Sequence, residues 1–197
     1  MIFKNKSETQ IIRYNGSDFA QGKIDETNFE FSQLDIIEDI TIRTSNKYER
    51  KTGNIYKGLL FKADFNKKFY GKTYVFPESL ISLRNIINAK GLVKLENIEF
   101  EEFFEVHSSN QIVARYILTP SFMEKIVEVR KKFNRSLRIT FIDSCIYISI
   151  PMEDDIFAPH ILGEHLGFKQ IEEYYTYLEL LYNLVNELNL NIRIWTK

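Results

Sequence analysis

The longest run of alternating apolar and polar residues, at positions 54–65, constrains the fold more than any other feature of the sequence. Apolar side chains recur at nearly every second position of this run, and only Lys57 interrupts them. Because the side chains of a β-strand point alternately to its two faces, this period predicts a long strand with one buried face. Thr52-Gly53-Asn54, at its start, is typical of a turn. The predicted apolar face consists of Ile55, Leu59, Phe61, Ala63 and Phe65.

Shorter segments with the same period surround this strand. Residues 27–32, 34–43 and 72–76 alternate in the same way, and the second of them is broken at Glu38-Asp39 by a bulge or a turn. Together these segments predict an antiparallel meander with one apolar face. Residues 137–150 predict a separate hairpin, in which Asp143-Ser144 forms the turn between two alternating strands.

The second half of the sequence favours helices. Residues 79–90 predict one helix, and residues 98–106 predict a short helical turn that continues into a strand. A third helix opens at Ser108 and ends at Leu118, because Thr119 precedes a proline. Gln111 stands where a capping box places its second residue. The apolar face of this third helix is expected at Ile112, Tyr116 and Ile117.

Two further helices complete the prediction. Thr119-Pro120 is typical of a helix start, and a buried stripe follows it at Phe122, Ile126, Val129 and Phe133. The last helix, over residues 171–188, has apolar residues at helical spacing and would span about 30 Å. Such a helix could pack across the whole sheet, within the core or against a partner helix.

The order of these elements predicts an α+β fold. An antiparallel sheet, made of the meander plus the hairpin, is packed by several helices that include a long C-terminal one. The length of 197 residues fits a single domain over residues 1–197, in which residues 1–13 are expected to be flexible.

Composition excludes several classes of function. The net charge of −1 comes with no basic stripe, so we expect no nucleic-acid binding. No apolar run reaches the roughly 20 residues that a membrane-spanning helix needs, and the start lacks a secretory signal. The single cysteine, Cys145, excludes an internal disulfide and suits the reducing cytoplasm, where we expect an inert thiol.

Two segments resemble an uncharacterised bacterial family, domain of unknown function 3137. The first is Lys57–Phe69, with Gly71 and Thr73 beyond it, and the second runs from Phe104 through Arg115 to Pro120 and Glu124. Members of that family often carry membrane-spanning segments ahead of this domain. The resemblance therefore implies a soluble member, or association with a membrane through an N-terminal region missing here. It implies no established activity, so no catalytic residue is carried over.

The sequence offers no convincing metal or cofactor motif. His160 and His165 are separated by five positions, so on a helix they would diverge by roughly 140° around its axis. Gly163 between them also makes a regular helix poor. The acidic triplet Glu153-Asp154-Asp155 lacks the spaced ligands and the glycine of a calcium loop. We therefore expect no metal and no cofactor.

Three residues are candidates for ligand binding. His107 lies at the end of a predicted strand, where pockets often open, and it is the one histidine considered as an acid or base. Arg115 and Asp64 are charges inside apolar segments, and a buried charge requires a partner. For Arg115 that partner could be a carboxylate of the protein or of a ligand.

Two functions from different classes are compatible with these features. The first is a non-catalytic binding or protein-interaction domain, in the cytoplasm or at the cytoplasmic face of a membrane, with an unknown protein partner. The alternative is an enzyme acting on a small-molecule substrate, at a pocket near His107 and Arg115 to which Asp64 contributes. Oligomerisation through the last helix is a third interpretation, and the sequence leaves the oligomeric state open.

Overall fold

The computed structural model describes residues 8–44, 47–65, 67–77, 91–133 and 136–152, with a few single residues between 175 and 186. Strands predominate in this part of the chain. The strands are β1 (Glu8–Ile24), β2 (Thr27–Thr44), β3 (Lys47–Asp64), β4 (Lys72–Pro77), β5 (Leu92–Val93), β6 (Phe104–Ser108), β7 (Arg138–Ile142) and β8 (Cys145–Pro151). The helices with described bounds are α2 (Ile98–Phe103), α3 (Gln111–Ile117) and α4 (Pro120–Phe133).

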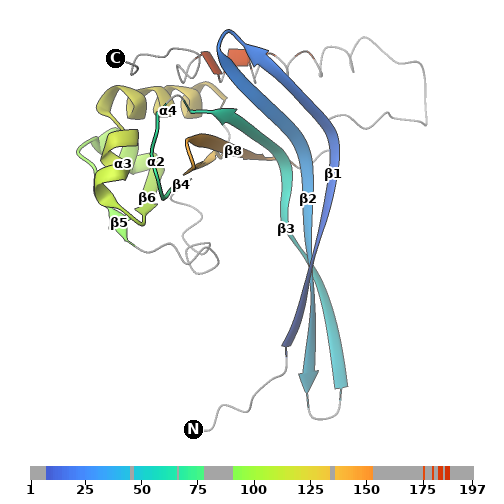
Figure 1. Cartoon of the computed structure of the whole chain (residues 1–197). Helices are drawn as coiled ribbons and strands as arrows, with labels where there is room; N and C mark the ends of the chain where they lie inside the picture. The colour runs from blue at the N-terminus through green and yellow to red at the C-terminus, as the bar shows by residue number, and fades with distance from the viewer. Residues whose placement is uncertain are drawn as a thin grey trace, which may run out of the picture.

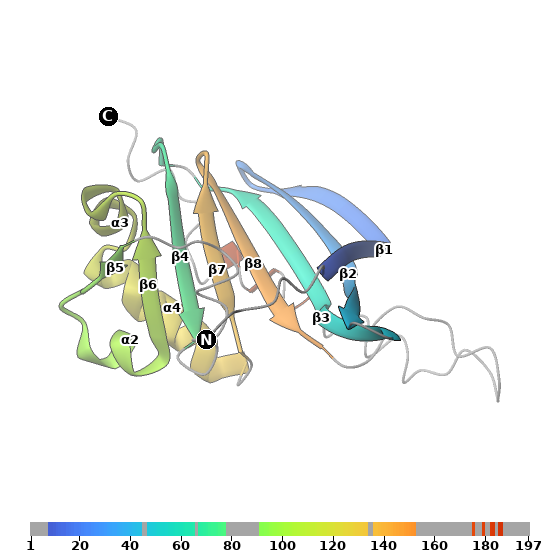
Figure 2. The same cartoon turned by 90° about the horizontal axis from the view of Figure 1, so that it is seen from below.

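The eight strands form one sheet in the order β1-β2-β3-β8-β7-β4-β6-β5. All seven pairings between neighbouring strands are antiparallel. Figure 2 shows this order along the sheet. The meander β1-β2-β3 is joined to the rest of the sheet through β8, which comes from the far end of the described sequence.

Strands β1, β2 and β3 extend well beyond the rest of the sheet. The pairing of β3 with β8 ends at Gly58 opposite Pro151, so only three strands continue past that point. We call this three-stranded extension, residues 8–15, 35–44 and 47–57, the arm. Figure 1 shows the arm projecting away from the helices as a strongly twisted ribbon. We call the remainder of the described structure the body.

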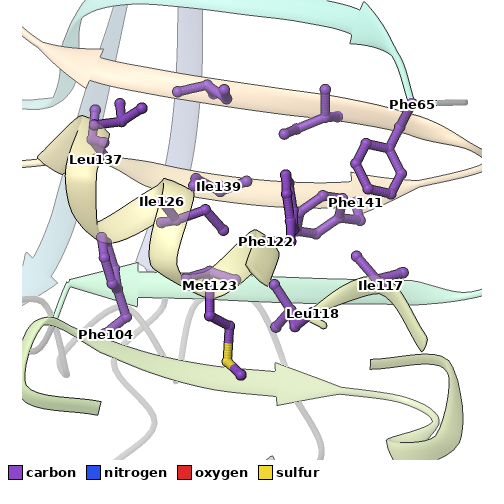
Figure 3. Packing of buried hydrophobic residues seen from close by; sticks show 14 of the residues in the cluster. Phe65, Phe104, Ile117, Leu118, Phe122, Met123, Ile126, Leu137, Ile139 and Phe141 are labelled. Atoms are coloured by element: carbon purple, nitrogen blue, oxygen red, sulfur yellow. The ribbon is translucent and has the colours of Figure 1, made fainter. Parts of the chain in front are cut away.

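The core lies on one face of the sheet, which we call the helix face because α4 lies across it (Figure 3). The ring of Phe122 on α4 packs against Phe65 and Phe141, with centroid distances of 5.3 and 6.1 Å. Ile126 is fully buried against the same cluster. We call the opposite face of the sheet the second face.

Several predicted elements are confirmed. The short helical turn that continues into a strand is α2 followed by β6, the helix that begins at Thr119-Pro120 is α4, and the hairpin is β7 and β8. Asp143 and Ser144 form its turn, both with positive φ, at 49° and 62°. The predicted stripe of α4 is confirmed at Phe122, Ile126 and Val129, which are buried, while the side chain of Phe133 lies outside those described.

The predicted α+β class is wrong for the described part of the chain, which is mainly an eight-stranded antiparallel sheet with three short helices. The predicted long C-terminal helix does not occur among the described elements. Only single residues of that segment are described, including the fully buried Val185, and they define no long helix. The predicted helix at 79–90 lies outside the described residues.

The meander was also predicted with a wrong neighbour and wrong boundaries: residues 72–76 form β4, which pairs with β6 and β7 rather than with β3. Thr52-Gly53-Asn54 is not a turn, because these residues lie within β3 and pair with Asp39, Glu38 and Ile37 of β2. Residues 27–43 belong to one continuous strand, whose irregularity lies between Ile36 and Ile37 rather than at Glu38-Asp39. Strand β1 includes residues 8–13, the end of the stretch that was expected to be flexible.

Helix α3 starts later than predicted. Its N-cap is Asn110, whose Oδ1 accepts hydrogen bonds from the amides of Ile112 and Val113 at 2.9 and 3.3 Å. Ser108 instead ends β6. The buried face of α3 is formed by Ala114 and Ile117, whereas Ile112 is 80% exposed, so the predicted face is rotated. In the described residues, no helix combines the length and the apolar character that crossing a membrane would require.

Candidate functional site

The second face of the sheet carries rows of side chains that the strand register places side by side. One row runs from Leu60 on β3 through Ser149 on β8 to Arg138 on β7. Side chains directly opposite one another in an antiparallel pair point to the same face. The next row contains Lys62, Tyr147, Thr140, Tyr74 and His107.

Gly58 lies where β3 and β8 meet, two residues after the buried side chain of Tyr56. A Cβ on Gly58 would lie 2.2 Å from the carbonyl oxygen of Ile150, so only glycine fits where β3 and β8 meet. The Tyr56 hydroxyl donates across this position to the carbonyl oxygens of Leu59 and Ile150, at 2.7 and 3.2 Å. Burial of Tyr56 raises the pKa of its phenol. The ring is therefore a fixed neutral platform at the junction of arm and body.

Arg138 lies over this platform. The centre of its guanidinium is 5.5 Å from the centroid of the Tyr56 ring, which is a cation–π geometry. The Nε atom of Arg138 is buried and has no hydrogen-bond partner in the described structure. Burial lowers the pKa of Arg138. The sheet thus holds a partly buried cation whose hydrogen-bonding capacity is unused by its described neighbours.

His107 lies on the same face, on β6. Its side chain is 7% exposed, and its Nε2 forms a hydrogen bond with Oε1 of Glu105. The buried Nδ1 has no hydrogen-bond partner in the described structure. Phe76 lies beside the imidazole, with a centroid distance of 6.3 Å. A histidine held by a carboxylate could accept or donate a proton at Nδ1 if a substrate reached that atom.

Arg115 lies on the surface of α3. It donates to Oε1 of Gln111 at 3.2 Å and to the carbonyl of Lys94 at 3.1 Å, and it has no carboxylate partner among the described residues. Lys94 and Glu105 both line a cavity of about 140 Å³ between β5 and α2. His107 and Arg115 therefore flank this cavity indirectly, through their bonds to Glu105 and Lys94. The cavity is smaller than the roughly 300–1,000 Å³ of ordinary ligand pockets.

Asp64 lies elsewhere on the sheet. Its Oδ2 accepts a hydrogen bond of 2.7 Å from Nδ2 of Asn28, and it lines an open polar groove of about 630 Å³ over β1, β2 and β3. Two other residues that line this groove also pair with each other, since Lys62 donates to Glu30 at 3.1 Å. Cys145 is opposite Asp64 in the register, and burial raises the pKa of its thiol. That shift lowers its reactivity as a nucleophile.

The structure does not bring the three sequence candidates into one pocket. Strands β8, β7 and β4 separate Asp64 on β3 from His107 on β6, which corresponds to roughly 19 Å at the usual strand spacing. The described residues contain no group of three or more metal-ligating side chains. The segments with His160, His165 and Glu153-Asp154-Asp155 lie outside the described residues.

Sequence reasoning missed Arg138 and Tyr56. Arg138 occupies a polar position of an alternating strand, which normally indicates a solvated side chain. Tyr56 lies on the side of β3 that the alternation assigned to polar residues. The available signal was Gly58, because a single glycine inside a strand pattern indicates a bulge or a close backbone approach.

One comparison with known proteins gives a match. A family model described as a protein of unknown function, DUF3137, matches residues 54–190. No curated protein and no solved structure matches the chain. The matched region begins within β3, so β1, β2 and the first residues of β3 precede it. It includes both segments that carried the resemblance, Lys57–Phe69 and Phe104–Pro120.

Proposed function

The chain belongs to the DUF3137 family of proteins of unknown function, and from this premise we propose that it is a non-catalytic interaction domain whose arm binds an extended segment of a partner protein. The observation that carries the proposal is the projecting three-stranded arm (Figure 1). Most of the arm precedes the region that matches the family model. Its partner would accordingly be specific to chains that carry such an extension.

The edge of the arm supports binding by strand addition. Strand β1 is the last strand of the sheet order, and its outer edge has no neighbouring strand among the described residues. Such an edge presents backbone N–H and C=O groups to an incoming strand. The β1–β2 register is regular from Glu8 to Ser17 and then shifts before Ala20. The incoming strand would therefore pair with the arm portion of β1, before this bulge.

The two faces of the arm define the chemistry of the partner. On the second face, Tyr14 lies opposite Ile36 and is 67% exposed. On the other face, Asp39 binds Arg13 and Arg50, so this face is polar. A strand added to β1 would place every second side chain on the face that carries Tyr14, with the nearest of them in contact with its ring. The partner segment is thus an extended one with apolar side chains at alternate positions.

Site-specific photocross-linking in cells tests the proposal. A photoreactive phenylalanine analogue at Tyr14 should give one defined adduct, because this position lies on the proposed binding strand. Tyr70 is the matched control, since it is a tyrosine on the body that is 90% exposed. An adduct pattern at Tyr14 no different from that at Tyr70 would contradict the proposal.

Proline variants then separate strand addition from other modes of binding. N–H groups of a strand point alternately inward and outward, so one of Tyr14→Pro and Asn15→Pro removes an outward donor and spares the β1–β2 ladder. A synthetic peptide of the cross-linked partner segment should bind the wild-type chain and lose affinity for that variant. Equal binding to the wild type and both folded proline variants would exclude addition to the β1 edge.

A further inference from the structure

The Arg138 guanidinium differs from the other arginines whose side chains are described in having a buried Nε atom without a hydrogen-bond partner. Arg13 and Arg50 bind the carboxylate of Asp39, and Arg115 donates to a side-chain amide and a carbonyl. Arg138 has the Tyr56 ring as its described partner, and its buried Nε has no acceptor among the residues that the structure describes. Charges that are removed from water are normally paired and hydrogen-bonded, so this arrangement is incomplete by itself.

The Tyr56 ring compensates only part of this cost. The negative face of the ring attracts the guanidinium, but it offers no acceptor in the plane of the five N–H groups. The planar fork of an arginine matches a carboxylate, which can accept two parallel hydrogen bonds from it. The Tyr56 ring holds the fork in place before any anion arrives, and pre-organisation of this kind increases affinity.

The neighbours of Arg138 indicate the class of anion. Ser149 and Leu60 share its row, and Pro151 lies in the adjacent row opposite Gly58. Leu60 and Pro151 are partly exposed, so an apolar body could lie against them. Lys62 lies in the next row on β3 and is already paired with Glu30. A single cation that is unpaired within the described part of the chain, beside a hydroxyl and an apolar surface, suits a monoanion better than a doubly charged phosphate.

We propose that Arg138 and Ser149 bind the carboxylate of a small organic acid whose apolar part lies against Leu60 and Pro151. This site is at the junction of arm and body, and it is independent of strand addition at the β1 edge. If no carboxylate binds at Arg138, the proposed interaction of the arm is unaffected. If the arm binds no partner strand, the proposed carboxylate site is unaffected, because the two sets of tests use different residues.

Titration of the full chain with benzoate, benzamide and inorganic phosphate tests the class of ligand. Benzoate should bind saturably and shift the NMR signals of the Arg138 side chain and the Ser149 amide. Benzamide has the same shape without the charge, so it should give no such shifts. Absence of benzoate binding, equal binding of benzamide, or a preference for phosphate would each overturn the proposal.

Substitutions at Arg138 test whether this residue binds the carboxylate. Arg138→Met should reduce benzoate affinity by about tenfold to a hundredfold, the usual effect of losing hydrogen bonds to a charged group. Arg138→Lys keeps the charge but not the fork, and it should lose part of the affinity. The matched control is Arg130→Met, because Arg130 also lies over an aromatic ring, that of Phe103, at 5.9 Å. Unchanged affinity in Arg138→Met, or an equal loss in Arg130→Met, would contradict the assignment.

Melting temperatures without ligand distinguish a binding arginine from a structural one. Replacing an incompletely paired, partly buried charge by an apolar side chain of similar length is often neutral or stabilising. Arg138→Met should therefore melt no lower than the wild type in the absence of benzoate, and it should lose the stabilisation that benzoate gives the wild type. A marked drop in the melting temperature of the ligand-free variant would assign Arg138 a structural role instead.

Discussion

At the residue scale, one extra residue in β3, Ile55, explains why the alternation of this strand changes phase. Tyr56 is buried, whereas Ile55, which the period of two placed on the core face, is only partly buried. The β2–β3 register shifts at Ile55, because Ile36 pairs with Tyr56 while Ile37 pairs with Asn54. The extra residue reverses the faces of β3 between arm and body. A pattern read without the bulge assigns Ile55 to the wrong face.

Replacing Gly58 by alanine should destabilise the protein by about 2–4 kcal/mol, because the added Cβ would clash with backbone and the positive φ is unfavourable for alanine. The clash is with the Ile150 carbonyl oxygen at 2.2 Å. Urea unfolding followed by circular dichroism measures the change. Gly53→Ala is the control, since nothing lies within 4 Å of a Cβ at that position of β3. It should stay within about 0.5 kcal/mol of the wild type. Similar losses in both variants would remove the close approach as the cause.

The sequence predicted part of the candidate site. His107 was singled out because it ends a predicted strand, and the structure places it on the second face with a buried Nδ1 that has no partner among the described residues. Arg115 was expected to be a buried charge, yet it lies on the exposed side of α3. The apolar residues around it in the sequence belong to the other side of that short helix. Arg138 could not be found by spacing, because its environment depends on pairing with β8 and on Tyr56 from β3.

At the element scale, the arm shows why long strands were predicted as short ones. Charged residues such as Asp35, Glu38 and Lys57 interrupt the alternation of β2 and β3. A strand needs strict alternation only where one face is buried, and the arm is a single layer. In the body, each element has a buried face and keeps its regular apolar period. This is why α4 and the β7–β8 hairpin were predicted correctly from their apolar periods.

The arm is instead held by a polar contact across its three strands. Asp39, on the central strand, accepts a hydrogen bond of 2.7 Å from Thr52 on β3. Its carboxylate also binds Arg13 on β1 at 3.0 Å and Arg50 on β3 at 3.5 Å. The Thr52 hydrogen bond, with the two guanidinium groups, lowers the pKa of Asp39. These neighbours cover the carboxylate, which is 4% exposed although the arm is one layer thick.

Acidification should loosen the arm through Asp39. The folded-state pKa of Asp39 lies below its unfolded value of about 3.9, so the stabilisation is fully present above that value. It is lost as the pH falls through the folded-state pKa. Hydrogen-exchange protection of arm amides, measured from neutral pH downwards, should fall in this range. Asp39→Asn should show reduced protection at neutral pH and a weaker acid dependence. Identical pH profiles in the two proteins would exclude Asp39 as the titrating group.

At the scale of the whole molecule, the body and the arm differ in what holds them together. In the body, Leu59 and Phe61 of β3 are completely buried beneath the helices. In the arm, Arg50, Lys51 and Thr52 of the same strand are exposed. The fold class was predicted wrongly because this single-layer part adds strand without adding helix. The local sequence alone does not indicate whether a strand will be covered by a second layer of structure.

Protection along β3 should therefore be graded. Local stability follows the density of buried apolar contacts, so amides of residues 59–63 should exchange much more slowly than those of residues 49–55. Native-state hydrogen exchange with mass spectrometry or NMR resolves the two halves of this one strand. Uniform protection from Lys47 to Asp64 would mean that arm and body open together, contrary to this expectation.

The pairing of β3 with β8 also determines the order in which parts of the fold can form during translation. The arm needs only contacts between consecutive strands, so it can assemble once β3 has left the ribosome. The inner edge of β3 pairs with Cys145–Pro151, so it must wait until β8 has been made. Pairing between segments so distant in sequence is slow, because a large loop has to close. A nascent chain would therefore display an open strand edge, from Gly58 to Asp64, until β8 has left the ribosome. We expect this edge to be the part that chaperones protect or that aggregates when they are limiting.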